Sequence, residues 1–156
     1  MVNGTSAVMS GLESDDGRYC SMTVDQTVSQ QTVLVVEDDV LIRMPIAQYL
    51  RDCGYKVIEA VNADEAITVL LHQETVVDIV FSDIDMPGST DGFGLSKWVR
   101  ERRPGLDVIL AGTVPRAVNA AKELCDDGPL PKPYEPQAVH DRVRRLLATR
   151  KAKGRE

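Results

Sequence analysis

The stretch Val77-Asp-Ile-Val-Phe-Ser-Asp-Ile-Asp-Met-Pro-Gly88 decides the fold of this chain. Its apolar run, residues 76–81, is interrupted only by Asp78, and two carboxylates, Asp83 and Asp85, follow it directly. A short apolar run closed by Pro-Gly is typical of a strand that is buried on both faces in a parallel sheet. We therefore expect Asp83 where the strand leaves the sheet, at the edge where open α/β folds bind ligands.

Length and composition indicate a single globular domain. The chain has 156 residues, 43% of them hydrophobic and 27% charged, which is ordinary for a domain with one core. Only 4% of the residues are aromatic and the net charge is −6, so nucleic-acid binding is not expected. Three widely separated cysteines without a CxxC pair indicate reduced thiols. No apolar run approaches the roughly 20 residues of a membrane span and no signal peptide is evident, so we expect a cytoplasmic protein with no membrane anchor.

The rest of the chain alternates between strand and helix patterns. Apolar runs predict four further strands, at 32–36, 55–59, 107–111 and around Leu130. Apolar residues at helical spacing predict five helices, near 42–53, at 62–71, at 91–103, from Pro115 and from Pro136. Five strands alternating with five helices predict an α/β fold with a doubly wound parallel sheet in the flavodoxin-like order 2-1-3-4-5.

Local signals refine two of these helices. Asn62 with Glu65 three residues later is a capping-box pattern for the second helix. Pro45 lies inside the first helix and removes one backbone donor, so we expect a late start or a kink there.

The two ends of the chain differ from the middle. Residues 1–30 are rich in Ser, Thr, Gly, Asp and Gln without periodicity, which predicts a disordered leader before a domain at 31–149. Residues 150–156 are predicted to form a basic tail after the last helix. Seven Lys or Arg residues lie between Arg142 and Arg155. Cations at a helix C-terminus are favoured by the macrodipole, which explains most of them, and an acidic protein partner is the weaker alternative.

Three carboxylates meet at one edge of the predicted sheet. Glu37 and Asp38 directly follow the strand at 32–36, and the order 2-1-3-4-5 makes this strand a neighbour of the one that ends near Asp83. Crowded carboxylates raise each other's pKa unless a cation compensates them, and Mg²⁺ prefers oxygen ligands of this kind. The alternative, solvated acids at strand ends, explains a single acidic pair but not a set that includes a lysine.

That lysine is Lys132, which follows the last strand. It lies between Pro131 and Pro133, which fix the backbone on either side of it. A lysine at this edge points a mobile cation toward the same crevice, where a phosphoryl group would be met by Mg²⁺ and by an ammonium group.

These motifs together resemble the receiver domain of two-component response regulators. The resemblance covers roughly residues 31–149 and is carried by Val33-Leu-Val-Val-Glu37-Asp38, Asp83-Ile-Asp-Met-Pro87 and Lys132-Pro133. It implies a phosphoacceptor switch of the stand-alone type, without a DNA-binding domain, which acts by contact with a downstream protein. Such a switch is not an enzyme, although it assists its own phosphoryl transfer and dephosphorylation.

The resemblance also implies the roles of individual residues. Asp83 would accept a phosphoryl group from a phosphohistidine on a sensor histidine kinase or a histidine phosphotransfer protein. Glu37, Asp38 and Asp83 would hold Mg²⁺ together with the backbone carbonyl of Asp85. Lys132 would bridge to the phosphoryl oxygens.

The chain departs from the family pattern at the switch. Receivers usually carry Thr or Ser at the end of strand 4, where this chain has Gly112 followed by Thr113. The aromatic residue usual three positions before the lysine is replaced by Pro129. We expect Thr113 to supply the missing hydroxyl, because Gly112 makes the loop permissive.

Two alternatives remain open from the sequence. The first is a degenerate receiver that acts as a phosphate-independent interaction module, favoured by Gly112 and Pro129. The second is a phosphatase of the haloacid-dehalogenase type, which uses an Asp-x-Asp motif such as Asp83-Ile-Asp85. In that class the motif normally follows the first strand, whereas here it follows the third.

Overall fold

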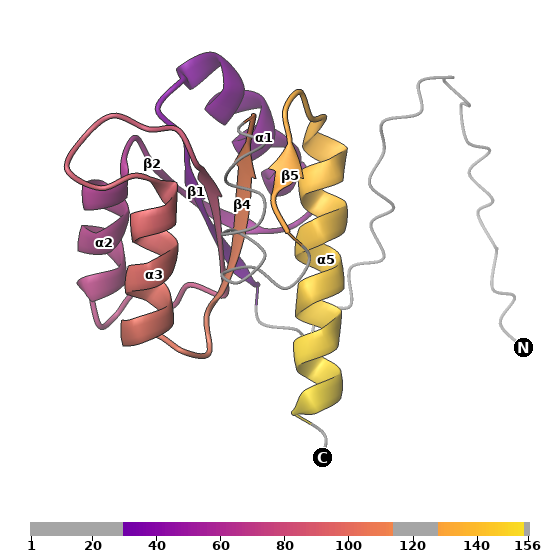
Figure 1. Ribbon diagram of the computed structural model, residues 1–156. Helices are drawn as coiled ribbons and strands as arrows, with labels where there is room; N and C mark the ends of the chain where they lie inside the picture. The colour runs from indigo at the N-terminus through magenta and orange to yellow at the C-terminus, as the bar shows by residue number, and fades with distance from the viewer. Residues whose placement is uncertain (1–29, 114–127, 155–156) are drawn as a thin grey trace, which may run out of the picture.

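The computed structural model describes residues 30–113 and 128–154, which form a parallel five-stranded sheet (Figure 1). The strand order is β2-β1-β3-β4-β5, as predicted, and each neighbouring pair is parallel. The strands are β1 (Thr32–Val36), β2 (Lys56–Ala60), β3 (Ile79–Asp83), β4 (Asp107–Gly112) and β5 (Leu130–Pro131). Asp83 is the last residue of β3, so the predicted strand begins later and ends later than the apolar run alone suggests.

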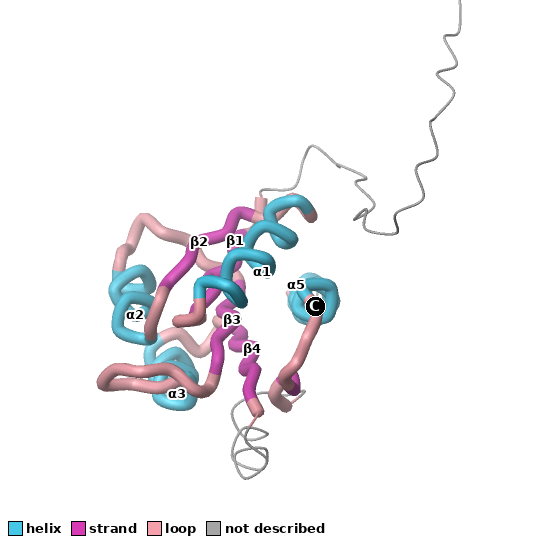
Figure 2. Tube along the Cα trace, turned by 90° about the horizontal axis from the view of Figure 1, so that it is seen from above, coloured by secondary structure: helices cyan, strands magenta, loops and turns pink. Residues whose placement is uncertain are grey.

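Helices cover both faces of the sheet (Figure 2). The described residues contain α1 (Val40–Asp52), α2 (Ala63–Leu71), α3 (Gly92–Arg102) and α5 (Pro136–Lys153). Viewed from above, α2 and α3 lie on one face and α1 and α5 on the other. The helix expected from Pro115 and the leader up to residue 29 lie outside the described residues. Within the described part, no helix is both long and apolar enough to cross a bilayer.

Two hydrophobic cores follow from the alternation of side chains along buried strands. All five residues of β1 and all five of β3 are buried. Val80 points into the core shared with α2 and α3, which includes Leu70 and Leu95. Its neighbour Phe81 points into the opposite core, with residues of α1 and α5 such as Ile46. The sheet is therefore a central layer, and its functional groups can lie only at its edges.

Carboxylate and amide caps begin three of the helices at the carboxyl edge of the sheet. Asp39 accepts a hydrogen bond from the amide of Leu41 at the start of α1, and Asp91 does the same for Gly94 in α3, both at 2.8 Å. The predicted N-cap of α2 is confirmed, because Asn62 Oδ1 accepts from the Glu65 amide at 2.8 Å, whereas the Glu65 carboxylate accepts from the Val61 amide and not from that of Asn62. These caps fix where each strand–helix connection turns.

Two local expectations differ from the structure. The late start expected from Pro45 is wrong, because α1 begins at Val40 and continues past the proline. The bond that Pro45 cannot make would go to the carbonyl of Leu41, a residue that is 80% exposed, so the missing bond lies on the solvent side of the helix. The predicted tail from residue 150 is helical up to Lys153. Arg150 explains this extension.

Arg150 joins the end of α5 to the amino edge of the sheet. Its guanidinium donates to the carbonyl of Asp78 at 2.6 Å and to that of Gly105, and Nε lies 3.5 Å from Asp107 Oδ2. These bonds hold the last turn of α5 against the protein, so the basic segment continues the helix instead of leaving it.

Candidate functional site

Parallel pairing of β1 and β3 places three carboxylates together. Val36 pairs with Ser82, so Glu37 and Asp83 are the next residues along the two neighbouring strands. One oxygen from each of Glu37, Asp38 and Asp83 lies within 4.8 Å of the others. Glu37 and Asp83 are buried, with 1% and 2% of their surface exposed, whereas Asp38 faces solvent. The crevice predicted from the strand order is therefore present, and we call these three residues the acidic cluster.

Lys132 reaches the acidic cluster from the end of β5. Its Nζ lies 3.0 Å from Asp83 Oδ2 and 3.7 Å from Glu37 Oε2. Its backbone amide donates to the Gly112 carbonyl at 3.4 Å, which ties the residue to the end of β4. The lysine thus lies between two buried carboxylates, as its position after β5 predicts.

Burial controls the protonation of the acidic cluster. Desolvation raises the pKa of Glu37 from 4.5 to about 7; the Asp39 amide opposes this, the charge of Asp83 adds to it, and the charge of Lys132 lowers it. Burial also raises the pKa of Asp83, although the hydrogen bond and charge of Lys132 lower it. Burial lowers the pKa of Lys132, but the contact with Asp83 outweighs this and raises it. One lysine cannot compensate three carboxylates, so the site attracts a further cation.

The donor set of the acidic cluster fits Mg²⁺. Glu37 Oε2 and Asp83 Oδ1 are buried and accept no hydrogen bond from the residues that the structure describes. Buried carboxylate oxygens without donors are costly, and a hard divalent ion with oxygen ligands satisfies them. Asp85 is exposed and its carboxylate is not part of the cluster, so its predicted ligation through the backbone carbonyl remains a prediction.

The connection from β3 to α3 holds Asp83 at the edge of the sheet. The amide of Ile84 donates to the Ala111 carbonyl at 2.7 Å, and the Gly92 amide donates to the Ile84 carbonyl at 3.0 Å. A Cβ atom at Gly92 would lie 2.1 Å from the carbonyl oxygen of Asp83, so only glycine fits there. Gly92 could not be found from the sequence, since nothing local distinguishes it from any other glycine at the start of a helix.

The residues of the predicted switch lie on the β4 side of the site. A Cβ atom at Gly112 would meet Ile84 Cδ1 at 2.9 Å and Ile84 Cβ at 3.0 Å, so a side chain at this position requires Ile84 to move. Thr113 is exposed and lines a pocket of about 270 Å³ together with four other residues, Ile42, Lys132, Pro133 and Tyr134. The structure thus places Thr113 near Lys132, and its role as a donor stays a prediction.

Tyr134 is a second residue that the sequence analysis did not single out. Its ring contacts that of Phe81 edge to face, with centroids 5.7 Å apart. Its hydroxyl is buried and makes no hydrogen bond to the described residues. The signal available in the sequence was an aromatic residue two positions after Lys132, which reads equally well as a packing residue.

Comparisons with known proteins agree with this geometry. The model of the response regulator receiver domain matches residues 33–144. The transcriptional regulatory protein ResD of Bacillus subtilis is 35% identical over 126 residues, which cover 80% of this chain and 50% of ResD. The chain therefore spans about half the length of that relative.

Solved structures give the same fold. A CheY-like receiver domain protein from Methanospirillum hungatei superimposes with a TM-score of 0.72 at 22% identity, over 80% of this chain and 99% of that one. TrrA from Thermotoga maritima, solved in complex with Mg²⁺ and BeF, gives 0.66 at 24% identity, over 75% of this chain and 99% of that one. With the family model matched along most of its length, the chain belongs to the response regulator receiver domain family, whose members are phosphoacceptor switches and not enzymes in the usual sense.

Proposed function

We propose that Asp83 is the phosphoacceptor of a two-component phosphorelay. The observation that carries the proposal is that its two carboxylate oxygens have different surroundings. Oδ2 lies 3.0 Å from Lys132 Nζ, whereas Oδ1 is buried and has no hydrogen-bond donor among the described residues. In the transfer, Oδ1 forms a bond to phosphorus while the phosphorus–nitrogen bond of a phosphohistidine breaks. The nitrogen keeps the electron pair of the broken bond, and the ring leaves as a neutral imidazole because its other nitrogen carries a proton.

The chain's own residues prepare this step. The ammonium of Lys132 favours the ionised carboxylate that attacks, and it is placed to contact the oxygens of the incoming group. Glu37, Asp38 and Asp83, with the backbone carbonyl of Asp85, would hold Mg²⁺, which supplies positive charge to the phosphoryl oxygens. The complex of TrrA with Mg²⁺ and BeF supports the choice of metal.

The surface next to the acidic cluster suits a protein partner. Three apolar side chains in the first turns of α1 are exposed, Val40 at 45%, Leu41 at 80% and Met44 at 59%. They lie only a few residues after Glu37 and Asp38, and exposed apolar groups gathered in this way mark binding surfaces. We assign this surface to a sensor histidine kinase or a histidine phosphotransfer protein, and the output to contact with a downstream protein.

Phosphorylation with a small donor tests the proposal. Incubation with acetyl phosphate and Mg²⁺ should add one phosphoryl group, detected by intact mass and located by peptide mapping. Asp83→Ala should abolish the adduct. The matched control is Asp85→Ala, which removes an exposed neighbouring carboxylate and should still be labelled.

The alternatives give different results in the same experiment. A degenerate receiver forms no adduct with any donor, although it still binds a partner. A phosphatase of the haloacid-dehalogenase type turns over small phosphoesters steadily and loses this activity in Asp85→Ala. Labelling that persists in Asp83→Ala contradicts the assignment of the phosphoacceptor.

A further inference from the structure

Tyr134, two residues after Lys132, carries a buried hydroxyl. The hydroxyl of Tyr134 makes no hydrogen bond to any residue in the described parts of the chain. Burying a hydroxyl in this way costs stability, so most buried polar groups in proteins are paired. Because the described residues offer this hydroxyl no partner, an acceptor that arrives in another state of the protein would satisfy it.

The ring of Tyr134 fixes where this hydroxyl lies. Tyr134 is two residues beyond Lys132, and its ring packs edge to face against Phe81 at an interplanar angle of 79°. Phe81 precedes Asp83 by two positions in β3, so both side chains leave the same face of the sheet. Tyr134 also lines the pocket that contains Lys132. The ring is thus fixed in the core on the face of the sheet from which the Asp83 side chain leaves.

The surroundings of the hydroxyl make it a donor. Burial raises the pKa of Tyr134, and the negative charges of Glu37 and Asp83 raise it further. The group stays protonated at all ordinary pH values, so its proton is available to an anionic oxygen. The same charges place it in a negative potential, where a donor is stabilised and a phenolate is not.

Phosphorylation would bring the missing acceptor. A phosphoryl group carries about −1.5 to −2 charges, in place of the single charge of the free carboxylate, and brings three strongly accepting oxygens. On this side of Asp83 the structure offers the ammonium of Lys132, while Gly112 has no hydroxyl and Thr113 faces solvent. The buried hydroxyl of Tyr134 is the remaining donor among the described residues that line the pocket.

We propose that the hydroxyl of Tyr134 binds the phosphoryl group on Asp83 and takes the place of the hydroxyl that Gly112 cannot supply. The inference rests on the proposed function, since it requires a phosphoryl group on Asp83. It assigns to the hydroxyl of Tyr134 the role of a hydrogen-bond donor, in the phosphorylated protein only. In the unphosphorylated protein the described residues offer the hydroxyl no acceptor.

Tyr134→Phe tests this inference, because it removes the hydroxyl and keeps the ring against Phe81. With Mg²⁺ and beryllofluoride, a non-covalent mimic of the phosphoryl group, the affinity of the variant should fall at least about tenfold, or ~1.4 kcal/mol. A loss of that size is reasonable for a hydrogen bond to a charged group. The unliganded variant should be as stable as the parent or slightly more stable, and the NMR shift of Tyr134 Cζ in the parent should move when beryllofluoride binds.

Two further variants separate the explanations. Tyr55→Phe removes a hydroxyl next to His140, on the side of the molecule formed by α1 and α5, and should leave the affinity unchanged. Thr113→Ala should weaken binding less than Tyr134→Phe does. Unchanged affinity in Tyr134→Phe, or an equal loss of stability without ligand, overturns the inference. If the phosphoryl group on Asp83 has the same lifetime in Tyr134→Phe as in the parent protein, this inference alone is refuted. Labelling that survives Asp83→Ala refutes the proposed function.

Discussion

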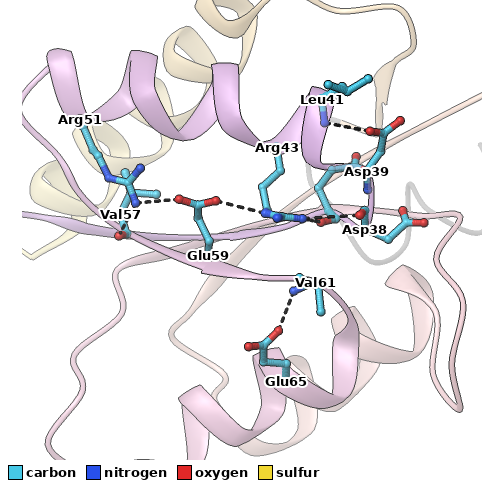
Figure 3. A network of polar contacts seen from close by, with 10 residues as sticks. Asp38, Asp39, Leu41, Arg43, Arg51, Val57, Glu59, Val61 and Glu65 are labelled. Carbon is cyan, nitrogen blue, oxygen red and sulfur yellow. Dashed lines mark hydrogen bonds and ion pairs between the residues drawn. The ribbon is translucent and has the colours of Figure 1, made fainter.

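Two glutamates near the carboxyl ends of the neighbouring strands β1 and β2 have opposite surroundings. Glu59 in β2 is bonded by two arginines of α1, with Arg43 Nε at 3.1 Å and Arg51 Nη2 at 2.8 Å (Figure 3). Glu37, directly after β1, shares a single lysine with Asp83, and one of its oxygens accepts no hydrogen bond from the described residues. Burial acts on both carboxyls, yet the pKa of Glu59 is lowered by its arginines while that of Glu37 is raised to about 7.

The difference separates a group that serves the fold from one that serves a ligand. Each oxygen of Glu59 accepts a hydrogen bond from an arginine, so its negative charge is compensated within the protein. Glu37 is left without enough positive charge, which is destabilising in the empty protein and favourable once a cation arrives. The two are also linked, because Arg43 donates to the Glu37 carbonyl at 2.8 Å as well as to Glu59. Arg43 therefore contacts the backbone of one glutamate and the side chain of the other.

The largest expected effect is on the pH dependence of stability in the metal-free protein. Folding raises the pKa of Glu37 from 4.5 to about 7, so the native state binds more protons than the unfolded state between these values. The free energy of unfolding should therefore fall as pH rises from about 4.5 through 7. At about 1.4 kcal/mol per pKa unit the loss is about 3 kcal/mol. Urea denaturation in the presence of EDTA at pH 5 and pH 8 measures it.

Glu37→Gln is the control for this effect. The variant cannot ionise at residue 37, so most of the loss between pH 5 and pH 8 should disappear. Equal slopes in parent and variant would mean that Glu37 is ionised at low pH in the folded protein, and the contrast with Glu59 would then be wrong.

The contrast between the two glutamates also shows what the sequence could predict. The strand order and the meeting of Glu37, Asp38 and Asp83 follow from short local patterns, because a parallel sheet brings the carboxyl ends of its strands to one edge. Lys132 was placed for the same reason, since it directly follows a strand. The arginine pairing of Glu59 was not predicted, because it depends on the angle at which α1 crosses the sheet.

Two features of the site depend on contacts between distant segments. Gly92 is required because the carbonyl of Asp83 approaches to 2.1 Å from where its Cβ would be, a contact between a helix and a strand end. The hydroxyl of Tyr134 is notable only because its ring packs on Phe81 and buries it. Neither contact has a local signal, so a single sequence cannot reveal it.

A somewhat smaller effect on the free energy of unfolding is expected from Mg²⁺, which should offset the repulsion among the carboxylates of the acidic cluster. A ligand that binds only the folded state at 100 times its Kd stabilises it by about 2.7 kcal/mol. Thermal unfolding at pH 8 with and without Mg²⁺ should show this gain in the parent. Asp38→Asn should reduce the gain, since it removes one ligand of the cluster. Glu59→Gln should retain it. A melting temperature that is indifferent to millimolar Mg²⁺ would show that the acidic cluster is not a metal site.

The smallest effect is expected at Glu59 itself. Glu59→Gln keeps the size of the side chain and removes the charge that Arg43 and Arg51 neutralise. Arg51 is 41% exposed and Glu59 is 29% exposed, so water screens the pairs and the loss should be about 1 kcal/mol. Folding lowers the pKa of Glu59, so its contribution is present above about pH 4.5 and is lost as pH falls below that value, opposite in sign to that of Glu37. Denaturation at pH 3 and pH 7 should therefore show that the free energies of unfolding of the parent and of Glu59→Gln are closer at pH 3. If the gap instead widens at pH 3, the arginines do not favour the ionised form of Glu59, and its pairing with α1 is not what distinguishes it from Glu37.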